Sequence, residues 1–466
     1  MKTNARRMHS NIEMLESRIA PATFTLIDLN GDKIHFTSSS HLLTSSYISE
    51  VNIGDADHYG FVVNILDASF NDSSLTVTVT KVRGGDGQTY IGINAGTNNL
   101  GNINIEGDLG MLTAGSDAMG ATAINSLAVN SIGRFPSVPL DSLVTSHVSG
   151  SIKKLTVRGD MDGTYLSVSQ NIGSIFVGGS VIGGDFSNDG KILAGGTIGS
   201  VVIKHDLRGG AGFESGSIFS TGDMGSIAIG GSIYGGYGNY SGLIGTDDSI
   251  KSVIVSGSIY GSIGKSSGEV QAGYSDPNGV IGTVTISGSL VGGGGTNSGA
   301  IGNGGGTGAL SVTNAVIGGN IIGGGGQYSG SVYATDGSIG RLTVKGSVFG
   351  GQGSNTGFIS SSDADGTIVI DGSVFGGYGG GSGYIALDGG LQTFILGGSL
   401  LGGFGPDSGD IALNTGMVGH LMRIDGDVRG SIGLASGSIT TGGGVAPVVL
   451  GEIFAGSGTD SGVVVS

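Results

Sequence analysis

Several short glycine-rich motifs in this chain have the residue types and spacing of catalytic or phosphate-binding loops. Residues 264–268, "GKSSG", fit the Gly-x-Ser-x-Gly pattern of a serine nucleophile, and their first three residues resemble part of a phosphate-binding loop. A nucleophilic serine of this type needs a strand-to-helix turn and a histidine partner, and no helical pattern follows here. The phosphate-binding loop needs a glycine where Ile259 stands. We therefore interpret both motifs as chance matches in a glycine-rich sequence.

Two other segments resemble calcium-binding loops. Residues 402–407, "GGFGPD", match the start of a nonapeptide calcium repeat, but aspartate does not recur at the same place in successive copies. Asp28, Asn30 and Asp32 follow an EF-hand-like order, but Lys33 occupies the place of the required glycine. The histidines are scattered and cysteine is absent, which excludes thiolate zinc sites, disulfides and cysteine nucleophiles. The sequence therefore predicts no metal or other cofactor, and the EF-hand-like segment is interpreted as a hairpin turn.

Paired carboxylates are a further candidate for chemistry. If the chain forms coils of about 26 residues, Asp185 would approach Asp206 and Asp223 would approach Asp248 on neighbouring coils. Two carboxylates at close range can divide acid and base roles in catalysis. Neighbouring surface acids are more often only solvated, so the sequence leaves both interpretations open.

The densest aromatic group of the chain consists of Tyr234, Tyr237, Tyr240, Tyr260 and Tyr274. Tyr234 and Tyr260 are separated by one repeat and are expected to stack on adjacent coils. The group is either an aromatic ladder that stabilises a corner or a platform that contacts sugar rings.

A repeat must position all of these side chains. The stretch "GGSIYGGYGNYSGLI" at residues 230–244 has close copies that start at Lys345, Asp371 and Gly397. We anchor each copy on the residue that precedes the serine of "GS(I/V)". From residue 179 to 257 the anchors recur every 26 residues, and later steps range from 25 to 31. The anchors are Gly107, Ser131, Gly159, Gly179, His205, Gly231, Gly257, Gly288, Gly319, Gly346, Gly372, Gly398, Gly426 and Gly451.

Apolar residues occupy fixed columns relative to each anchor. They stand two residues before it, two after it and thirteen after it, and a fourth column four residues before it is mostly apolar. Alternation with period two and β-branched side chains indicate strands, and the glycine pairs indicate corners. We expect Ile244 to point inward and Leu243 outward, so that an aspartate would destabilise the coil far more at Ile244 than at Leu243.

These features predict an all-β fold, a right-handed parallel β-helix with about 26 residues per coil. About 14 coils spaced by ~4.8 Å would form a rod roughly 65 Å long. A leucine-rich repeat is the alternative, because "MGSIAIGGSIY" at residues 224–234 nearly fits its apolar spacing. Against it, the second half of each copy resembles a third strand and contains no helical pattern.

The chain divides into three predicted parts. Residues 1–22 are a leader with a short helix over Asn11 to Arg18, residues 23–100 a small β domain that caps the first coil, and residues 101–466 the β-helix. The final coil, from Leu450 to Ser466, reaches its third strand without a polar terminal repeat. We therefore expect either that the natural chain continues or that this coil docks onto another subunit.

Composition excludes several functions. The apolar content of 38% argues against a disordered glycine-rich linker. The net charge of −16, without a basic stripe, argues against nucleic acid as a partner. No apolar run approaches the ~18 residues of a membrane helix.

The leader "MLESRIAPA" at residues 14–22 resembles the Leu-Glu-x-Arg box of large secreted or surface proteins of Planctomycetes and Verrucomicrobia. The hairpin "LIDLNGDKIHF" and the coil "MGSIAIGGSIYGG" are similar to the glycine-rich β-repeat members of that group. The resemblance implies an extracellular or envelope-associated repeat protein and supplies no catalytic residues. We predict a non-enzymatic surface β-helix that acts as a spacer, adhesin or matrix component, with surface glycans or other subunits as partners. The alternative is a carbohydrate-active β-helix, either a polysaccharide lyase or a glycan binder.

Overall fold

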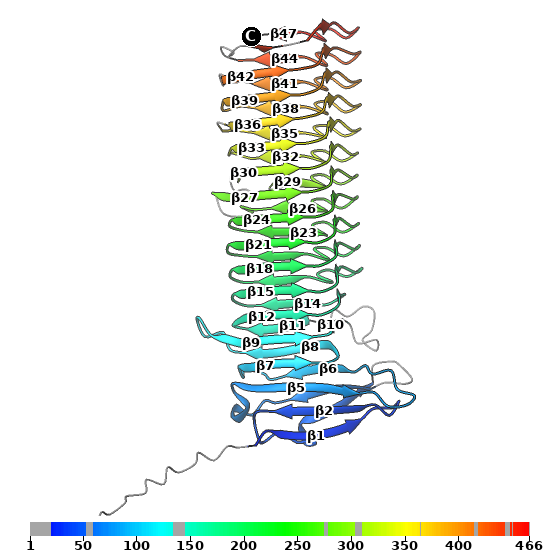
Figure 1. The fold of residues 1–466 in the computed structure, drawn as a ribbon, viewed down its shortest axis with the longest axis vertical. Coiled ribbons are helices and arrows are strands. Elements are labelled where there is room, and N and C mark those ends of the chain that lie inside the picture. Colours follow the sequence, from blue (N-terminus) through cyan, green and yellow to red (C-terminus); the bar gives the residue numbers. More distant parts are fainter. Residues whose placement is uncertain are drawn as a thin grey trace, which may run out of the picture.

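The computed structural model describes residues 20–52, 59–133, 145–274, 278–302, 310–363, 365–413, 418–442, 448–449 and 451–465. Figure 1 shows a straight stack of coils that begins at a small N-terminal β region. The helix expected over residues 11–18 lies outside the described residues.

Each regular coil contains three strands, as the apolar columns predict. A long strand ends at the Gly-Ser corner, a two-residue strand follows, and a glycine-rich loop leads into a short return strand. The long strands are β12 (Ser151–Val157), β15 (Ile172–Val177), β18 (Ile198–Ile203), β21 (Met224–Ile229), β24 (Ile250–Val255), β27 (Gly279–Ile286), β30 (Leu310–Ile317), β33 (Ile339–Val344), β36 (Asp365–Ile370), β39 (Leu391–Leu396), β42 (Val418–Ile424) and β45 (Val448–Val449).

The strands after the Gly-Ser corner are β13 (Met161–Asp162), β16 (Val181–Ile182), β19 (Leu207–Arg208), β22 (Ile233–Tyr234), β25 (Ile259–Tyr260), β28 (Leu290–Val291), β31 (Ile321–Ile322), β34 (Val348–Phe349), β37 (Val374–Phe375), β40 (Leu400–Leu401), β43 (Val428–Arg429) and β46 (Ile453–Phe454). The return strands are β14 (Tyr165–Val168), β17 (Ile192–Ala194), β20 (Ile218–Ser220), β23 (Leu243–Thr246), β26 (Glu269–Gln271), β29 (Ala300–Gly302), β32 (Val332–Ala334), β35 (Ile359–Ser361), β38 (Ile385–Leu387), β41 (Ile411–Leu413), β44 (Ile439–Thr441) and β47 (Val464–Val465).

Equivalent strands of successive coils pair in parallel and in register. In β21 and β24, for example, Ile227 lies opposite Val253 and Ile229 opposite Val255. The stack amounts to about 14 turns of about 26 residues. The predicted parallel β-helix is therefore confirmed, and the leucine-rich repeat is wrong because a strand, rather than a helix, returns the chain.

The four apolar columns form the core, and they are buried in every regular coil from Val177 to Val428. The structure adds a fifth column at the start of the long strands, which the sequence analysis missed. Each member stands three residues before the next apolar residue of its strand, as Ile172 does before Ile175. The spacing is three rather than two because a residue such as Gly173 is left out of the strand pairing. Its members are Ile172, Ile198, Met224, Ile250, Ile281, Val312, Ile339 and Leu391.

The N-terminal region changes from antiparallel to parallel pairing. β1 (Ala22–Ile27) and β2 (Lys33–Ser38) form the predicted hairpin, and β2 pairs with β5 (Ser73–Thr80). The EF-hand-like segment is the turn, in which the buried Asp32 carboxylate accepts from the N–H groups of Val82 at 2.7 Å and Gly87 at 2.6 Å. Two short 3-10 helices, η1 (Ser45–Tyr47) and η2 (Ala68–Phe70), belong to this region.

Parallel pairing begins when this region meets the first coils. β3 (Ile48–Asn52) pairs antiparallel with β4 (Tyr59–Asn64), whereas β4 pairs in parallel with β6 (Tyr90–Asn94). The remaining early strands are β7 (Leu100–Ile105), β8 (Asp108–Gly115), β9 (Thr122–Val129), β10 (Ser131–Ile132) and β11 (Thr145–Ser149). β5 pairs in parallel with β7, so the N-terminal region occupies the edge of the first coil.

Candidate functional site

The glycine-rich loops are closed by a repeated pair of hydrogen bonds. The buried Ser241 hydroxyl accepts from the N–H of Gly236 at 2.9 Å and donates to the carbonyl of Gly238 at 2.7 Å. Tyr240 and Gly242 flank this serine with φ angles of 58° and 62°, in the left-handed region. The loops are therefore structured corners of the coil. The same bond to the N–H five residues earlier is accepted by Ser215, Ser267, Ser298, Ser329, Thr356, Ser382, Ser408 and Ser436.

The nucleophile-like motif at residues 264–268 is one of these corners. Its central Ser266 is fully buried and has a φ of 50°. The following Ser267 closes the loop on the N–H of Ser262 at 3.0 Å. Ser266 is therefore buried in the turn and Ser267 closes the loop, which agrees with the interpretation of the motif as a chance match.

The loops also cover the outer side of the return strands. Leu243 faces away from the core but is only 3% exposed, so an aspartate there would also be shielded from water. The outward residues at the start of the return strands form a row, which we call the covered row, and loop side chains contact it. The Lys191 ammonium pairs with Glu214, and the centroid of the Phe358 ring lies 6.1 Å from that of Tyr328. The buried members of the row are Lys191, Ser217, Leu243, Glu269, Ala300, Ser331, Phe358, Asp410 and Ser438.

Polar members of this covered row find partners. The Tyr333 hydroxyl donates to the fully buried Glu269 carboxylate at 2.9 Å, and burial raises the pKa of Tyr333 well above its usual value. The Asp410 carboxylate accepts from the N–H of Ser438 at 2.8 Å and from its hydroxyl at 3.0 Å. Burial nevertheless raises the pKa of Asp410 to about 7. Hydrogen bonds and ion pairs of the covered row therefore help to hold the loops in place, and the spacing of apolar residues in the sequence does not predict these contacts.

The five predicted tyrosines divide into two groups and one exposed residue. Tyr234 and Tyr260 stack with ring centroids 5.1 Å apart and planes within 8°, which confirms the expected stacking. The Arg208 guanidinium lies 4.9 Å from the Tyr234 ring, so the faces of Tyr234 are occupied from both sides. The alternative, that these rings contact sugar rings, stays a prediction.

The second tyrosine group lies against the loops. Tyr240 and Tyr274 have ring centroids 6.4 Å apart at 86°, and Phe213 lies 5.7 Å from Tyr240. Burial raises the pKa of Tyr274, and the neighbouring Tyr240 adds to this effect. Tyr237, at a loop tip, is 69% exposed. A sugar ring therefore has access to Tyr237 but not to both faces of the stacked pair.

Exposed apolar side chains at loop tips extend this feature along the rod, and the apolar columns of the repeat do not predict them. Tyr378 and Phe404 stack with centroids 4.7 Å apart. Both residues stand six positions after their anchors. Other copies have residues of different types at this position, so it does not form an apolar column and the sequence pattern does not identify it. We call the exposed set the loop ridge, and it consists of Phe213, Tyr237, Ile263, Tyr378, Phe404, Ile432 and Leu434.

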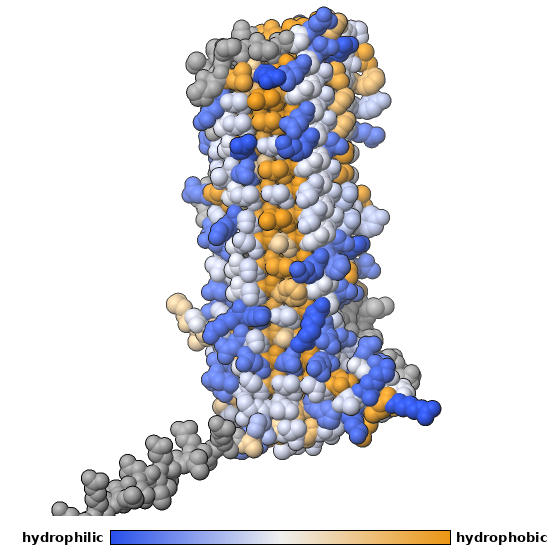
Figure 2. All heavy atoms as spheres, viewed as in Figure 1, coloured by the Kyte–Doolittle hydropathy of each residue, from blue (hydrophilic) through white to orange (hydrophobic). Residues whose placement is uncertain are grey.

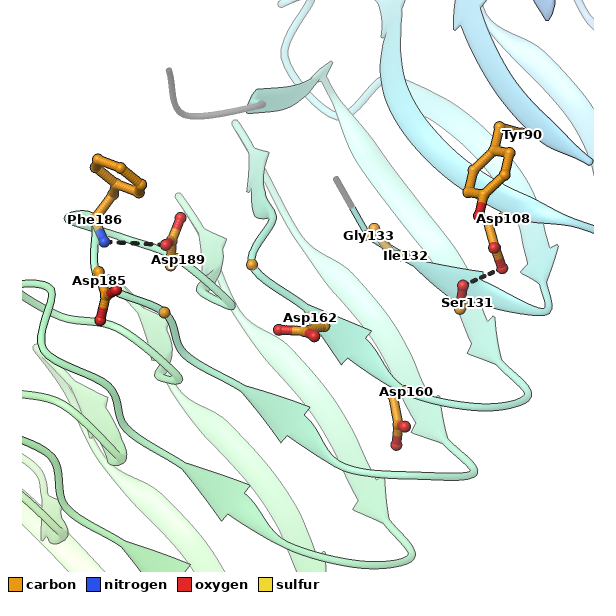
Figure 3. Close-up of a pocket in the computed structure, with 12 residues that line it drawn as sticks. Tyr90, Asp108, Ser131, Ile132, Gly133, Asp160, Asp162, Asp185, Phe186 and Asp189 are labelled. Carbon is orange, nitrogen blue, oxygen red and sulfur yellow. Dashed lines mark hydrogen bonds between the residues drawn. The ribbon is translucent and has the colours of Figure 1, made fainter. Parts of the chain in front are cut away.

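An acidic groove of about 730 Å³ lies beside the N-terminal coils, on the same side as the loops (Figure 3). Asp108 accepts from the Ser131 hydroxyl, and burial raises the pKa of Asp108. Its further lining includes Tyr90, Asp160, Asp162, Asp185, Phe186 and Asp189.

Part of this acidic groove is structural. The Asp160 carboxylate accepts from the N–H of Ser180 on the next coil at 2.7 Å, and Asp189 accepts from the N–H of Phe186 at 3.0 Å. Asp162 and Asp185 are exposed. The groove therefore presents the negative charge of Asp160, Asp162 and Asp185 to solvent, and Asp160 also connects two coils.

Members of the predicted carboxylate pairs are engaged in the scaffold. Asp206 accepts from the N–H of Ser232 at 2.8 Å and pairs with Arg208. Asp223 accepts from the N–H of Ser249 at 3.3 Å. Asp206 stands in a ladder that runs from Gly159 to Gly426, in which the side chain after each anchor accepts from the backbone N–H of the equivalent residue in the next coil, as Ser232 does from Ser258 at 3.1 Å. These bonds explain why serine, asparagine or aspartate follows the anchor.

The outer face of the long strands is more open than that of the return strands: Ile254 is exposed and most of its column is half-buried, although Thr343 is buried. Figure 2 shows an apolar stripe that follows the rod along one face. On the long strands, one outward column is mainly apolar: Phe176, Val202, Ala228, Ile254, Val316, Val369 and Ile395 pair in register through Thr285 and Thr343.

Basic side chains accompany this stripe. The long strands β12 to β42, each with the residue that follows it, contain eight basic and three acidic residues. The basic residues are Lys153, Lys154, Arg158, Lys204, Lys251, Arg341, Lys345 and Arg423, and the acidic ones are Asp365, Asp371 and Asp425. This face is therefore positive in a chain with a net charge of −16.

Among the described residues, no group of three histidine, aspartate or glutamate side chains has the arrangement needed for a metal ion. Nor does the described part of the chain contain a helix of the length and hydropathy needed to cross a membrane. Comparison with protein-family models, curated proteins and solved structures found no match.

Proposed function

We propose that this protein is a non-enzymatic extracellular or cell-surface rod that acts as a spacer, adhesin or matrix component. The observation that supports this role is the unbroken stack: from β12 to β42 each long strand pairs in parallel with the next. Cross-coil hydrogen bonds and packing make such a stack stiff along its axis. Many polar side chains hydrogen-bond within the scaffold: those that follow the anchors connect successive coils, and the loop-closing hydroxyls hold the glycine-rich loops.

The location is tested on intact cells that express the tagged full chain. We expect an externally added protease to remove the rod from intact cells, while a cytoplasmic marker protein stays uncut. A chain that is cut only after lysis would contradict the surface location.

The second candidate is carbohydrate binding or cleavage, favoured by the open acidic groove. Asp162, Asp185, Tyr90 and Phe186 offer carboxylates and aromatic surface to a sugar chain. A glycan array and a parallel degradation assay separate this role from the first. Release of oligosaccharides that Asp162→Asn with Asp185→Asn abolishes would establish the second candidate and refute the non-enzymatic one.

A further inference from the structure

Two surfaces that follow the axis of the rod have opposite net charge, and the acidic residues of the second surface lie at its two ends, at 160–214 and 407–460. The positive one is the open face of the long strands. The other is the segment from each anchor to the loop-closing serine, which from residue 160 to residue 461 contains ten acidic and three basic residues. The basic ones are Arg208, Lys265 and Arg429, and the acidic ones are Asp160, Asp162, Asp185, Asp189, Asp206, Glu214, Asp407, Asp427, Glu452 and Asp460.

The charges of both surfaces concentrate at the same height at the N-terminal end of the stack. The coil that begins with β12 has exposed Lys153, Lys154 and Arg158 on its long strand, and exposed Asp160 and Asp162 follow directly. The coil of β18 has an exposed Lys204 on its long strand, and the exposed Asp185 lies in the loop of the preceding coil, whereas Glu214 is paired with Lys191. A neighbouring rod placed parallel, without axial shift, would therefore meet opposite charges.

At the coils of β18, β21 and β24, exposed apolar loop-ridge residues and a hollow in the long-strand face lie at the same height on the rod. Three loop-ridge residues, Phe213, Tyr237 and Ile263, are 46%, 69% and 61% exposed. They belong to the coils of β18, β21 and β24. The long strands of these coils border a hollow of about 490 Å³, whose lining includes Gly199, Met224, Gly225, Ile250 and Lys251.

We propose that copies of this chain pack side by side, parallel and in register, with the loop ridge of one rod against the long-strand face of the next. Because the two contact surfaces differ, the interface is heterologous and generates an open lateral array. Both surfaces have the same repeat of ~4.8 Å, which keeps the two rods in register, and the opposite charges meet at the N-terminal coils. This inference deepens the proposed structural role and depends on the rod, but not on its location.

The available area is sufficient for a stable contact. Eleven long strands from β12 to β42, spaced by ~4.8 Å and about 20 Å wide, present roughly 1,000 Å². A standard interface buries about 800 Å² on each partner. Pairing of two long-strand faces is disfavoured, because it would bring eight basic residues against eight others.

The test uses the full chain in sedimentation velocity and negative-stain electron microscopy at low and high salt. We expect lateral rafts of parallel rods at low salt that separate as salt screens the exposed charges. The variants Lys153→Glu with Lys154→Glu, and Asp162→Lys with Asp185→Lys, each weaken association by about tenfold or more. Unchanged thermal unfolding of both variants shows that the rod itself is intact.

Mixing the two charge-reversed variants is the decisive experiment. In the mixture each reversed face meets a reversed ridge and each natural face a natural ridge, so rafts form again. Val464→Lys with Val465→Pro alters only the last coil, and it leaves lateral rafts unchanged while it removes any end-to-end contact.

Two outcomes would overturn the proposal. One is a natural chain that stays monomeric at every salt and protein concentration tested. The other is a mixture that remains dispersed. If a monomeric rod binds polygalacturonate and loses it on Lys153→Glu with Lys154→Glu, the basic face serves an anionic glycan instead. None of these results depends on the protease test of location.

Discussion

The long strands and the return strands both direct alternate side chains into one core, yet their outer faces differ. Ile254, on the outer face of β24, is 49% exposed, whereas Leu243, on the outer face of β23, is 3% exposed. The difference arises because a glycine-rich loop folds back over the return strands, whereas no such loop covers a long strand in the part of the chain that the structure describes. Alternation of apolar and polar residues therefore identifies the inner face of a solenoid strand but does not show whether its outer face is solvated.

The largest effect that distinguishes these faces is expected from aspartate substitutions at three positions. Ile244→Asp buries a carboxylate in the core and should destabilise the protein by several kcal/mol. Leu243→Asp should cost about 2 kcal/mol or more, because the loop excludes water from it. Ile254→Asp should change stability by only about 0.5 kcal/mol. Urea unfolding followed by circular dichroism measures all three.

Equal stability of the Leu243→Asp and Ile254→Asp variants would show that the loops do not seal the return strands. Equal loss in the Ile244→Asp and Ile254→Asp variants would contradict the inward assignment of the core columns.

A second effect concerns pH and the covered row. Burial raises the pKa of Asp410 to about 7 from an ordinary value of 3.8. The folded state therefore holds this proton more tightly than the unfolded state. The stabilisation is complete below about pH 4 and is lost as pH rises through 7, with a difference of up to about 4 kcal/mol.

Differential scanning calorimetry between pH 4 and pH 8 tests this dependence. Asp410→Asn removes the titration, so the difference in Tm between the two proteins should change across this range. Asp371→Asn, at an exposed position of the open face, is the matched control and should show no such change. A pH-independent difference between the Asn variant at 410 and the natural chain would sink the prediction.

The smallest effect separates the loop-closing serines from serines on the open face. Ser241→Ala leaves the half-buried N–H of Gly236 without its acceptor and removes the donor to the Gly238 carbonyl, which should cost about 1–3 kcal/mol. Ser252, on the open face, bonds the hydroxyl of Ser226 at 3.1 Å in an exposed position. Ser252→Ala should therefore cost less than about 0.5 kcal/mol.

Hydrogen exchange of the Gly236 and Gly238 amides gives an independent measure of the same loop. Faster exchange in the Ser241→Ala variant alone supports the closing role, and equal exchange in both variants argues against it.

Local spacing was enough to predict the coils. Columns at fixed distances from the anchor, such as Val255, Ile259 and Val270, specify three strands because β-branched side chains at period two fit a pleated and half-buried surface. The fifth column escaped detection because the alternation breaks near Gly173. The stacked Tyr234 and Tyr260 could be predicted from their separation by one repeat.

The loop ridge and the acidic groove could not be predicted in this way. Each draws residues from several coils, and exposure depends on how far a loop projects. Tyr237 and Tyr240 are three residues apart, but Tyr237 is exposed at a tip and Tyr240 packs against Phe213.

The sequence by itself determined the repeat, its strands and its inward columns, because these depend on residue spacing within one coil and on pairing with an identical neighbour. Only the tertiary structure decided which outer faces are covered, since that depends on the path of each loop over its strand. It also decided that the Asp160 and Asp206 carboxylates accept from backbone N–H groups of the next coil. A carboxylate near another coil satisfies whichever donor lies closest, and the sequence does not contain that distance.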